Sequence, residues 1–450
     1  MMSSNAELVK KALKDRKFEE AAEIYFSSSS KTSIKAHEGE IASFSYAETS
    51  GLGARVVLGN KMGLSFTEKV NGENIAVSLD KARENATYIP DDKGYAIFES
   101  DEERVYDRFK SADLHKVSVE QKKELALEIE KYAKAYDERI INVPEAIYSD
   151  VANERIVANS YGLCKTEKAS LCYAYAYLMA SDGKDTSVGF YFQGEKNFAD
   201  LDPKKIAELA AEDALCKLNA EEIDSGSYPV IFSASTASSL LGAFINSAGS
   251  AFFGENIQKG RSKLEGKLGQ LIAASHINII DDPSIFSMGA ASFDDEGVEA
   301  STQYLIRNGV FETELHNLYS AKRSGVESTG NGSRGYSSPL STKLYSPYLQ
   351  PSDKKEESLF GEAEGGIYIT DVEGLHAGLN QISGDFSLAA KGFLIENGKK
   401  GKAIKNITVA GNFYDLIKNI IAVADNNRFN DYAEFSSPSI YVKALSVSGK

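Results

Sequence analysis

The sequence predicts an α+β protein, with an N-terminal domain of helices on antiparallel sheet and a C-terminal β-rich, barrel-like domain. A strongly capped helix begins at Val119, alternating apolar runs lie on both sides of it, and an Asn308-Gly309 pair between two β-rich runs indicates a tight hairpin. The 450 residues, 42% of them hydrophobic, can bury a large core. We place the boundary between domains of residues 1–225 and 226–450 in an Asp-Ser-Gly-Ser run.

The first 90 residues or so are expected to contain helix, strands and helix in that order. Apolar residues recur at helical spacing over residues 5–26, and Ser27–Ser30 is expected to break the pattern. Alternation over residues 34–67 predicts strands around a turn at Gly51–Gly53. Residues 74–86 return to helical spacing, so the segment should end in a helix.

Residues 119–139 predict the best-defined helix of the chain. Ser118 and Gln121 have the spacing of a capping box, which satisfies amide groups of the first turn. Short strands are expected in residues 145–195, and a helix beginning at Asp202-Pro203 should follow them. This order repeats that of the first segment and suggests an internal duplication.

The second half is expected to be mostly β-structure. Helices are expected near residues 236–250, 260–273 and 412–420. A strand over residues 277–280 should end at Asp281-Asp282-Pro283, because proline supplies no amide to a β-ladder.

Composition excludes several classes of function. The net charge of −15 argues against a nucleic-acid partner, since such proteins carry basic surfaces for phosphate groups. The N-terminus lacks the apolar core of a signal peptide, and 18 apolar residues never run together, so neither secretion nor a membrane span is expected. Cys164, Cys172 and Cys216 match neither a disulfide framework nor a zinc knuckle, and Cys172 and Cys216 should be packed in apolar faces. We therefore expect a cytoplasmic protein.

A series of ordered motifs runs through the second half of the chain. They are GRSKLEGKLGQ at 260–270, DDPS at 281–284, FDDEGV at 293–298, RNG at 307–309, STGNGSRG at 328–335, GDFSLAAKGFLIENG at 384–398, VAGN at 409–412 and SPSIYV at 437–442. SGLGARVV at 50–57 adds one motif in the first half. Together these motifs resemble the TldD/PmbA family, whose members have been called modulators of DNA gyrase and include zinc-dependent peptidases.

The resemblance implies where a metal would lie. In zinc-bearing members an H-E-x-x-x-H motif lies on the helix before the stretch that corresponds to Lys259-Gly260, and a late cysteine completes the site. Here Ile245, Asn246 and Ser250 occupy the His, Glu and His positions, and no cysteine follows Cys216. Isoleucine offers no ligand and asparagine no general base. No metal, cofactor or catalytic residue is therefore expected on this chain.

This pattern is similar to the PmbA or TldE branch, which shares the fold but lacks the metal site. The resemblance implies a heterodimer with a TldD-like zinc-bearing subunit that cleaves unfolded or modified peptides in an enclosed cavity. Zinc and catalysis would belong to the partner, and this chain would build a wall of the chamber. A homodimer is the alternative where that partner is absent.

The acidic turns allow three interpretations. Asp281, Asp282 and the Asp294–Glu296 turn could bind a hard cation such as Mg²⁺, or could be solvated ends of strands. The family resemblance adds a third, in which they organise the long glycine-rich loop or a subunit contact. Asp294, Asp295, Glu296, Asn331 and Arg334 are accordingly the candidates for a peptide path or an interface.

The glycine-rich loop matches the residue pattern of a dinucleotide-binding motif but lacks the helix that the motif requires. Gly330–Gly335 reads G-x-G-x-x-G, but Pro339 follows soon after, where a helix is required. A flexible loop facing substrate or an interface is the better interpretation. The tyrosines of residues 335–351 either line a peptide path or belong to a surface loop.

Three classes of function remain open. The chain is the non-catalytic subunit of a zinc peptidase, a self-sufficient hydrolase with an unrecognised site, or a peptide-binding or regulatory protein that does not cleave. The five histidines lie far apart, and none has a second histidine at ligand spacing. His37-Glu38 imitates the start of a zinc motif but falls in an expected strand.

Overall fold

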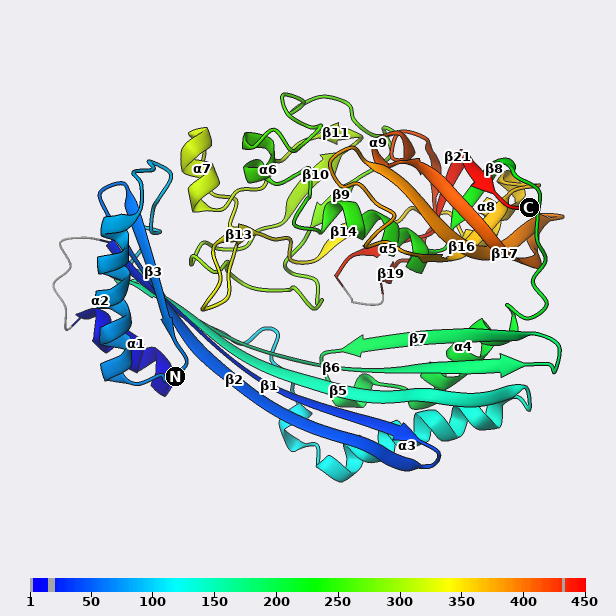
Figure 1. Cartoon of the computed structure of the whole chain (residues 1–450), viewed down its shortest axis with the longest axis horizontal. Helices are drawn as coiled ribbons and strands as arrows, with labels where there is room; N and C mark the ends of the chain where they lie inside the picture. Colours follow the sequence, from blue (N-terminus) through cyan, green and yellow to red (C-terminus); the bar gives the residue numbers. More distant parts are fainter. Residues whose placement is uncertain (1–2, 15–20, 431–433) are drawn as a thin grey trace.

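The computed structural model describes residues 3–14, 21–430 and 434–450. It confirms the α+β class: a long curved sheet built by the first half of the chain lies along a β-rich body built by the second half (Figure 1). Among the described residues, the helices are all too short or too polar to cross a membrane.

The long sheet has seven strands in the order β3-β2-β1-β5-β6-β4, and β7 also pairs with β6. β1 pairs antiparallel with both β2 and β5, so the two halves of the sheet meet at the β1–β5 pair. The strands are β1 (Ala21–His37), β2 (Glu40–Leu58), β3 (Lys61–Thr67), β4 (Glu103–Tyr106), β5 (Ile140–Asn159), β6 (Cys164–Ser181) and β7 (Thr186–Glu195).

Two pairs of helices pack at the two ends of this sheet (Figure 1). At one end α1 (Ser4–Lys14) and α2 (Gly72–Tyr88) share a core with β1 and β2, and at the other α3 (Val119–Tyr136) and α4 (Pro203–Leu215) share one with β5 and β6. The order helix, three antiparallel strands, helix thus occurs twice, as the predicted duplication requires. Short 3₁₀ turns precede α3 and α4, at Leu114–Lys116 and Phe198–Asp200.

Both predicted N-caps of this half are confirmed. The Ser118 hydroxyl accepts a hydrogen bond from the Gln121 amide, and the Gln121 side chain accepts one from the Ser118 amide. The Asp202 carboxylate accepts one from the Lys205 amide, with Pro203 as the first helical residue. Cys164 and Cys172 are buried, but Cys216 is exposed at the end of α4, so its predicted packing is wrong.

Two boundaries in the first segment were predicted wrongly. Residues 21–26, expected to be helical, and Ser27–Ser30, expected to be a break, both lie inside β1. Residues 15–20 lie outside the described part of the chain. Gly51 and Gly53 lie inside β2 instead of forming a turn, and a Cβ on Gly53 would come within 2.3 Å of the Tyr336 carbonyl oxygen. The glycines therefore allow close approach of a loop and do not reverse the chain.

The second half contains a closed barrel. Its five strands are ordered β17-β16-β15-β8-β21, and pairing of β17 with β21 closes it, which confirms the barrel-like prediction. The helix α5 (Ala234–Ile245) packs into the core of this half beside the barrel. The barrel strands are β8 (Gly226–Phe232), β15 (Ile367–Glu373), β16 (Asp385–Glu396), β17 (Lys399–Asn412) and β21 (Ile440–Ser448), with β18 (Ile420–Val423) added beside β21.

A second six-stranded sheet, ordered β11-β10-β9-β14-β20-β19, lies beside the barrel. The predicted hairpin is confirmed, because Asn308 and Gly309 have φ values of 50° and 78° between β10 and β11. The strands are β9 (Ile279–Asp281), β10 (Gln303–Arg307), β11 (Val310–Phe311), β14 (Pro347–Leu349), β19 (Arg428–Phe429) and β20 (Ser436–Ser437), and β12 (Gly332–Ser333) pairs separately with β13 (Ser341–Thr342).

The remaining helices are short. The helix predicted over residues 260–273 is absent from that described segment, because Gly260, Gly266 and Gly269 adopt positive φ values of 64° to 77°. The predicted helix at 236–250 ends at Ile245, and the one at 412–420 is a single turn. These helices are α6 (Gly254–Gln258), α7 (Leu318–Ser324), α8 (Glu356–Glu362) and α9 (Phe413–Leu416).

Candidate functional site

The positions that correspond to the zinc motif lie at and beyond the C-terminal end of α5. Ile245 is the last residue of the helix, and its side chain is buried in the core of the second half. Asn246 is the C-cap, and its side-chain amide donates to the Glu434 carbonyl oxygen at 3.2 Å. Ser250 is completely buried, and its hydroxyl lies 3.4 Å from the Phe252 amide, from which it accepts a hydrogen bond.

These three residues do not fit a zinc ion. Zinc in proteins is held by thiolate, imidazole and carboxylate groups, and here the donors would be an aliphatic side chain, an amide and an enclosed hydroxyl. Nowhere in the described ranges do three His, Cys, Asp or Glu side chains gather as a metal site requires. No catalytic step can therefore be derived through a metal held by these residues.

A cleft of about 990 Å³ lies beside this end of α5. One wall is β7 with the adjacent face of α4, and the other is the end of α5, the loop after β15 and the segment around β19. Arg428 places its guanidinium 4.9 Å from the ring centroid of Tyr191 across this space. Ser247 and Thr370 line the cleft, and their hydroxyl oxygens are buried without a hydrogen-bond partner among the described residues.

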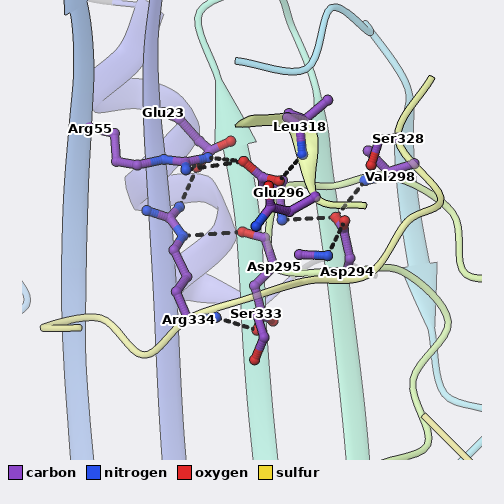
Figure 2. Close-up of polar contacts among 12 residues, drawn as sticks. Glu23, Arg55, Asp294, Asp295, Glu296, Val298, Leu318, Ser328, Ser333 and Arg334 are labelled. Carbon is purple, nitrogen blue, oxygen red and sulfur yellow. Dashed lines mark hydrogen bonds and ion pairs between the residues drawn. The ribbon is translucent and has the colours of Figure 1, made fainter. Parts of the chain in front are cut away.

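The acidic turn and the glycine-rich loop meet away from this cleft, against the other end of the long sheet. Arg55 of β2 donates to Glu23 of β1 through Nε at 3.0 Å and Nη2 at 2.7 Å, and to Glu296 through Nη1 at 3.1 Å (Figure 2). Arg334 also donates to Glu23. All four side chains are buried, so a network of paired charges joins the sheet to the turn and the loop.

Asp295 extends the same network to β5 and β6. Its carboxylate accepts from Arg155 Nη1 at 2.6 Å and from the Arg334 amide at 3.0 Å, and Lys343 Nζ lies 3.6 Å away. Arg155 in turn donates to Glu167 at 2.7 Å. The acidic turn is thus held by arginines from two strands of the long sheet.

Asp294 binds backbone amides instead of charged side chains. One carboxylate oxygen accepts from the Glu296 and Val298 amides, both at 2.9 Å, and the other accepts from the Gly332 amide at 2.8 Å (Figure 2). A Cβ on Gly332 would lie 2.7 Å from Glu296 Oε2 and 3.0 Å from Asp294 Oδ2. Glycine at this position therefore lets the loop reach the acidic turn.

Asn331 fixes the centre of the glycine-rich loop. Its amide nitrogen donates to the Lys343 carbonyl oxygen at 2.8 Å, and its oxygen accepts from Gln303 at 3.0 Å and Thr329 at 2.7 Å. The buried Tyr345 donates to the Gly330 carbonyl oxygen. These bonds hold the centre of the loop, and the flexibility expected of it stays a prediction.

The pKa values of the buried acidic groups are shifted in different directions. Burial and the nearby Glu296 carboxylate raise the pKa of Asp294, and burial also raises the pKa of Glu296. Burial would raise the pKa of Asp295 as well, but Lys343 and Arg155 lower it below the ordinary value. Burial raises the pKa of Asp281 to about 7, although the Tyr345 and Ser346 amides donate to it.

The interpretation of the acidic turns as solvated strand ends is wrong for Asp281 and for Asp294–Glu296, which are all buried. Many of their partners lie between 22 and 241 positions away along the chain, which no local pattern in the sequence reveals. The turn instead organises the glycine-rich loop, as one of the three interpretations expected. The remaining question, contact with a peptide or another subunit, stays a prediction for Asp294, Asp295, Glu296, Asn331 and Arg334.

Fold and motifs together define a chain of the PmbA/TldD family. The family's C-terminal metallopeptidase domain matches residues 225–449, its central domain matches 112–218 and its first domain matches 22–86. The chain belongs to this metallopeptidase family.

Individual relatives agree with this assignment. The Metalloprotease PmbA homolog of Haemophilus influenzae is 27% identical over 95% of this chain and 92% of its own length. Metalloprotease MJ0996 of Methanocaldococcus jannaschii is 28% identical, with 89% of each chain covered.

Solved structures show the same fold over the whole chain. A Thermotoga maritima protein named as a candidate modulator of a DNA gyrase has a TM-score of 0.88 and 30% identity, with 98% of each chain covered. TldE of Thermococcus kodakarensis has a TM-score of 0.86 and 24% identity, covering 99% of this chain and 100% of its own.

Proposed function

We propose that this chain is the subunit without a metal site in a heterodimeric zinc metallopeptidase of the TldD/TldE kind. The TldD-like partner holds zinc and cleaves, and this chain forms part of the wall of an enclosed cavity that receives unfolded or modified peptides. One observation carries the proposal. The chain belongs to a metallopeptidase family, yet two positions that correspond to the zinc motif cannot bind zinc. Ile245 is buried in the core, and the side-chain amide of Asn246 donates to the Glu434 carbonyl oxygen.

The cleft beside α5 supports a role in holding peptide. At about 990 Å³ it is large enough for several residues of an extended chain. Aromatic side chains of β7 and the polar residues Gln193, Ser239 and Asn427 line it, which suits a ligand with both apolar side chains and backbone polar groups. A wall of this kind positions a peptide without taking part in bond cleavage.

The test is reconstitution with a homologue that keeps H-E-x-x-x-H and the late cysteine. The two chains are purified separately and together, and cleavage of an unfolded peptide is followed by mass spectrometry. We expect cleavage only by the pair, and its loss when the motif glutamate of the zinc-bearing homologue is replaced by glutamine. Cleavage by this chain alone would contradict the proposal and favour a self-sufficient hydrolase. Stable peptide binding by this chain, with no cleavage by the pair, would favour a binding or regulatory protein.

A variant of this chain tests its own contribution. Ala243 lines the cleft, so Ala243→Trp should reduce cleavage by the pair about tenfold or more, through lost space for the peptide. Ala199 is exposed and outside the cleft, so Ala199→Trp is the matched control and should leave the rate unchanged. Equal rates for both variants and the unchanged chain would remove the cleft from the proposal.

A further inference from the structure

Arg428 of β19 carries a charge that the fold leaves without an acidic partner. Its guanidinium forms neither an ion pair nor a hydrogen bond within the described part of the chain. It differs in this from Arg55, Arg155 and Arg334, whose guanidinium groups are all bonded to carboxylates. Arg428 is exposed and lines the cleft. Its N–H donors are therefore open to a ligand that enters the cleft.

Both the backbone and the side chain of Arg428 are held in place. Its carbonyl oxygen lies 2.6 Å from the Ser238 hydroxyl of α5, from which it accepts a hydrogen bond, and Ser437 of β20 is its partner in the sheet. Its guanidinium lies over the ring of Tyr191 on β7, the strand of the long sheet that is nearest to β19 in Figure 1. An aromatic face attracts a guanidinium without neutralising its charge, and the N–H groups at the edge stay free for a planar acceptor.

Two of the acids that line the cleft, Asp213 and Asp371, face a different cation. Lys217 donates to the Asp213 carboxylate at 2.8 Å. Burial would lower the pKa of Lys217, but Asp213 and, more weakly, Asp371 raise it. Both acids therefore serve this lysine, which also lines the cleft, and not Arg428.

The other two acids of the lining, Glu195 and Glu434, lie farther along the walls. Glu195 is four residues from Tyr191 on β7, which corresponds to about 13 Å of strand. Glu434 bonds Asn246 at the C-terminal end of α5, about 12 Å of helix beyond the residue that bonds the Arg428 carbonyl oxygen. Within the described chain the cleft thus supplies no anion to Arg428, and a bound ligand can.

We propose that Arg428 binds a carboxylate of the peptide in the cleft, so that this chain prefers peptides with a free C-terminus or an acidic side chain at that point. The inference rests on the proposed function, in which the cleft receives peptide, and adds the chemical group that is recognised. Arginine suits a carboxylate because its planar fork donates two parallel hydrogen bonds to the two oxygens. The ring of Tyr191 already restricts the guanidinium, which reduces the entropy lost on binding.

The test measures binding of dye-labelled, unstructured peptides to the full chain by fluorescence anisotropy. Two matched peptides without acidic residues end in a carboxylate and in an amide. Two further peptides, both amidated, carry one internal glutamate and one internal glutamine. We expect the carboxylate member of one set to bind with a dissociation constant about tenfold lower than its neutral match. The set that shows this difference tells whether the carboxylate is terminal or belongs to a side chain.

Substitution of Arg428 assigns the difference to this side chain. Arg428→Met keeps an apolar stem of similar length but removes the charge, so the matched peptides should bind it equally. Arg428→Lys keeps the charge but loses the planar fork, so a smaller difference of about threefold should remain. Arg261 is exposed and outside the cleft, so Arg261→Met is the matched control and should keep the full difference. Circular dichroism and the thermal midpoint check that the variants are folded.

Three results would each overturn the inference: equal binding within both sets of peptides, no binding of any peptide by the chain, or a tenfold difference that Arg428→Met leaves intact. None of them removes the proposed function, which depends on cleavage by the reconstituted complex. Conversely, a complex that fails to cleave would contradict the proposed function, even where the chain alone distinguishes the matched peptides through Arg428.

Discussion

Arg55 bridges Glu23 and Glu296, and its Nη2 lies 2.7 Å from the first carboxylate and 3.1 Å from the second, although 241 positions separate Arg55 from Glu296 in the chain. The bridge joins the long sheet to the acidic turn of the second half. All three side chains are buried; Arg55 is the ion-pair partner of Glu296, and it shares Glu23 with Arg334.

Arg55→Met should therefore lower the free energy of unfolding by about 3–5 kcal/mol, because it leaves the buried Glu296 carboxylate without its ion-pair partner and Glu23 with Arg334 alone. Arg104 is largely exposed, and Arg104→Met is the matched control, with an expected change below about 1 kcal/mol. Urea denaturation followed by circular dichroism measures both. Equal stability of the two variants would show that the network does not join the halves.

Gly332→Ala should destabilise the chain by about 1–3 kcal/mol, since its Cβ would lie 2.7 Å from Glu296 Oε2 and 3.0 Å from Asp294 Oδ2. Gly361 in α8 has open space where a Cβ would be added, so Gly361→Ala should be neutral or stabilise by up to about 1 kcal/mol. The thermal unfolding midpoints of the two variants measure this difference in stability. An unchanged midpoint for Gly332→Ala would mean that the loop can move away from the acidic turn at no cost.

Asp281 should give the chain a characteristic dependence on pH. Burial raises its pKa from 3.8 to about 7, so the folded state holds this proton more tightly than the unfolded chain. The stability it contributes is full below about pH 4 and is lost as the pH rises toward 7. Asp281→Asn removes this loss, so the stability of the variant relative to the unchanged chain should rise between about pH 4 and pH 7 and stay level above pH 7.

Denaturation curves over that range measure the gain. Asp353 is an exposed aspartate, and Asp353→Asn is the control that should follow the unchanged chain at every pH. A gap between Asp281→Asn and the unchanged chain that stays constant with pH would contradict this account.

Local signals in the sequence predicted local structure well. The capping box at Ser118, the Asp202-Pro203 start of α4 and the Asn308-Gly309 hairpin all depend on residues within a few positions of one another, and all are confirmed. The β-rich, barrel-like character of the second half was also predicted, and the pairing of β17 with β21 shows that the barrel is closed.

Features that depend on distant partners were not predictable in the same way. The serine run of β1 forms strand because β2 and β5 pair with it on both sides, and Gly53 stays in β2 because Tyr336 packs against it. The Asp294–Glu296 turn is buried because Arg55, Arg155 and Arg334 reach it from other parts of the fold. In each case tertiary contacts override the local preference.

The prediction that the candidate positions hold no metal, in contrast, depends on residue chemistry alone. Isoleucine offers no metal ligand and asparagine no general base, so the expectation follows from the residue types. The structure adds that Ile245 packs in the core and that the Asn246 amide is bonded to Glu434.

The decisive measurement is the zinc content of the chain purified alone, incubated with zinc and dialysed, beside that of a homologue with the complete motif. We expect far less than one zinc per chain here and about one in the homologue, because a closed site requires ligands that this chain lacks at the motif. About one tightly held zinc per chain would contradict the account. His376 and Glu434, which both line the cleft, would then be the first residues to replace.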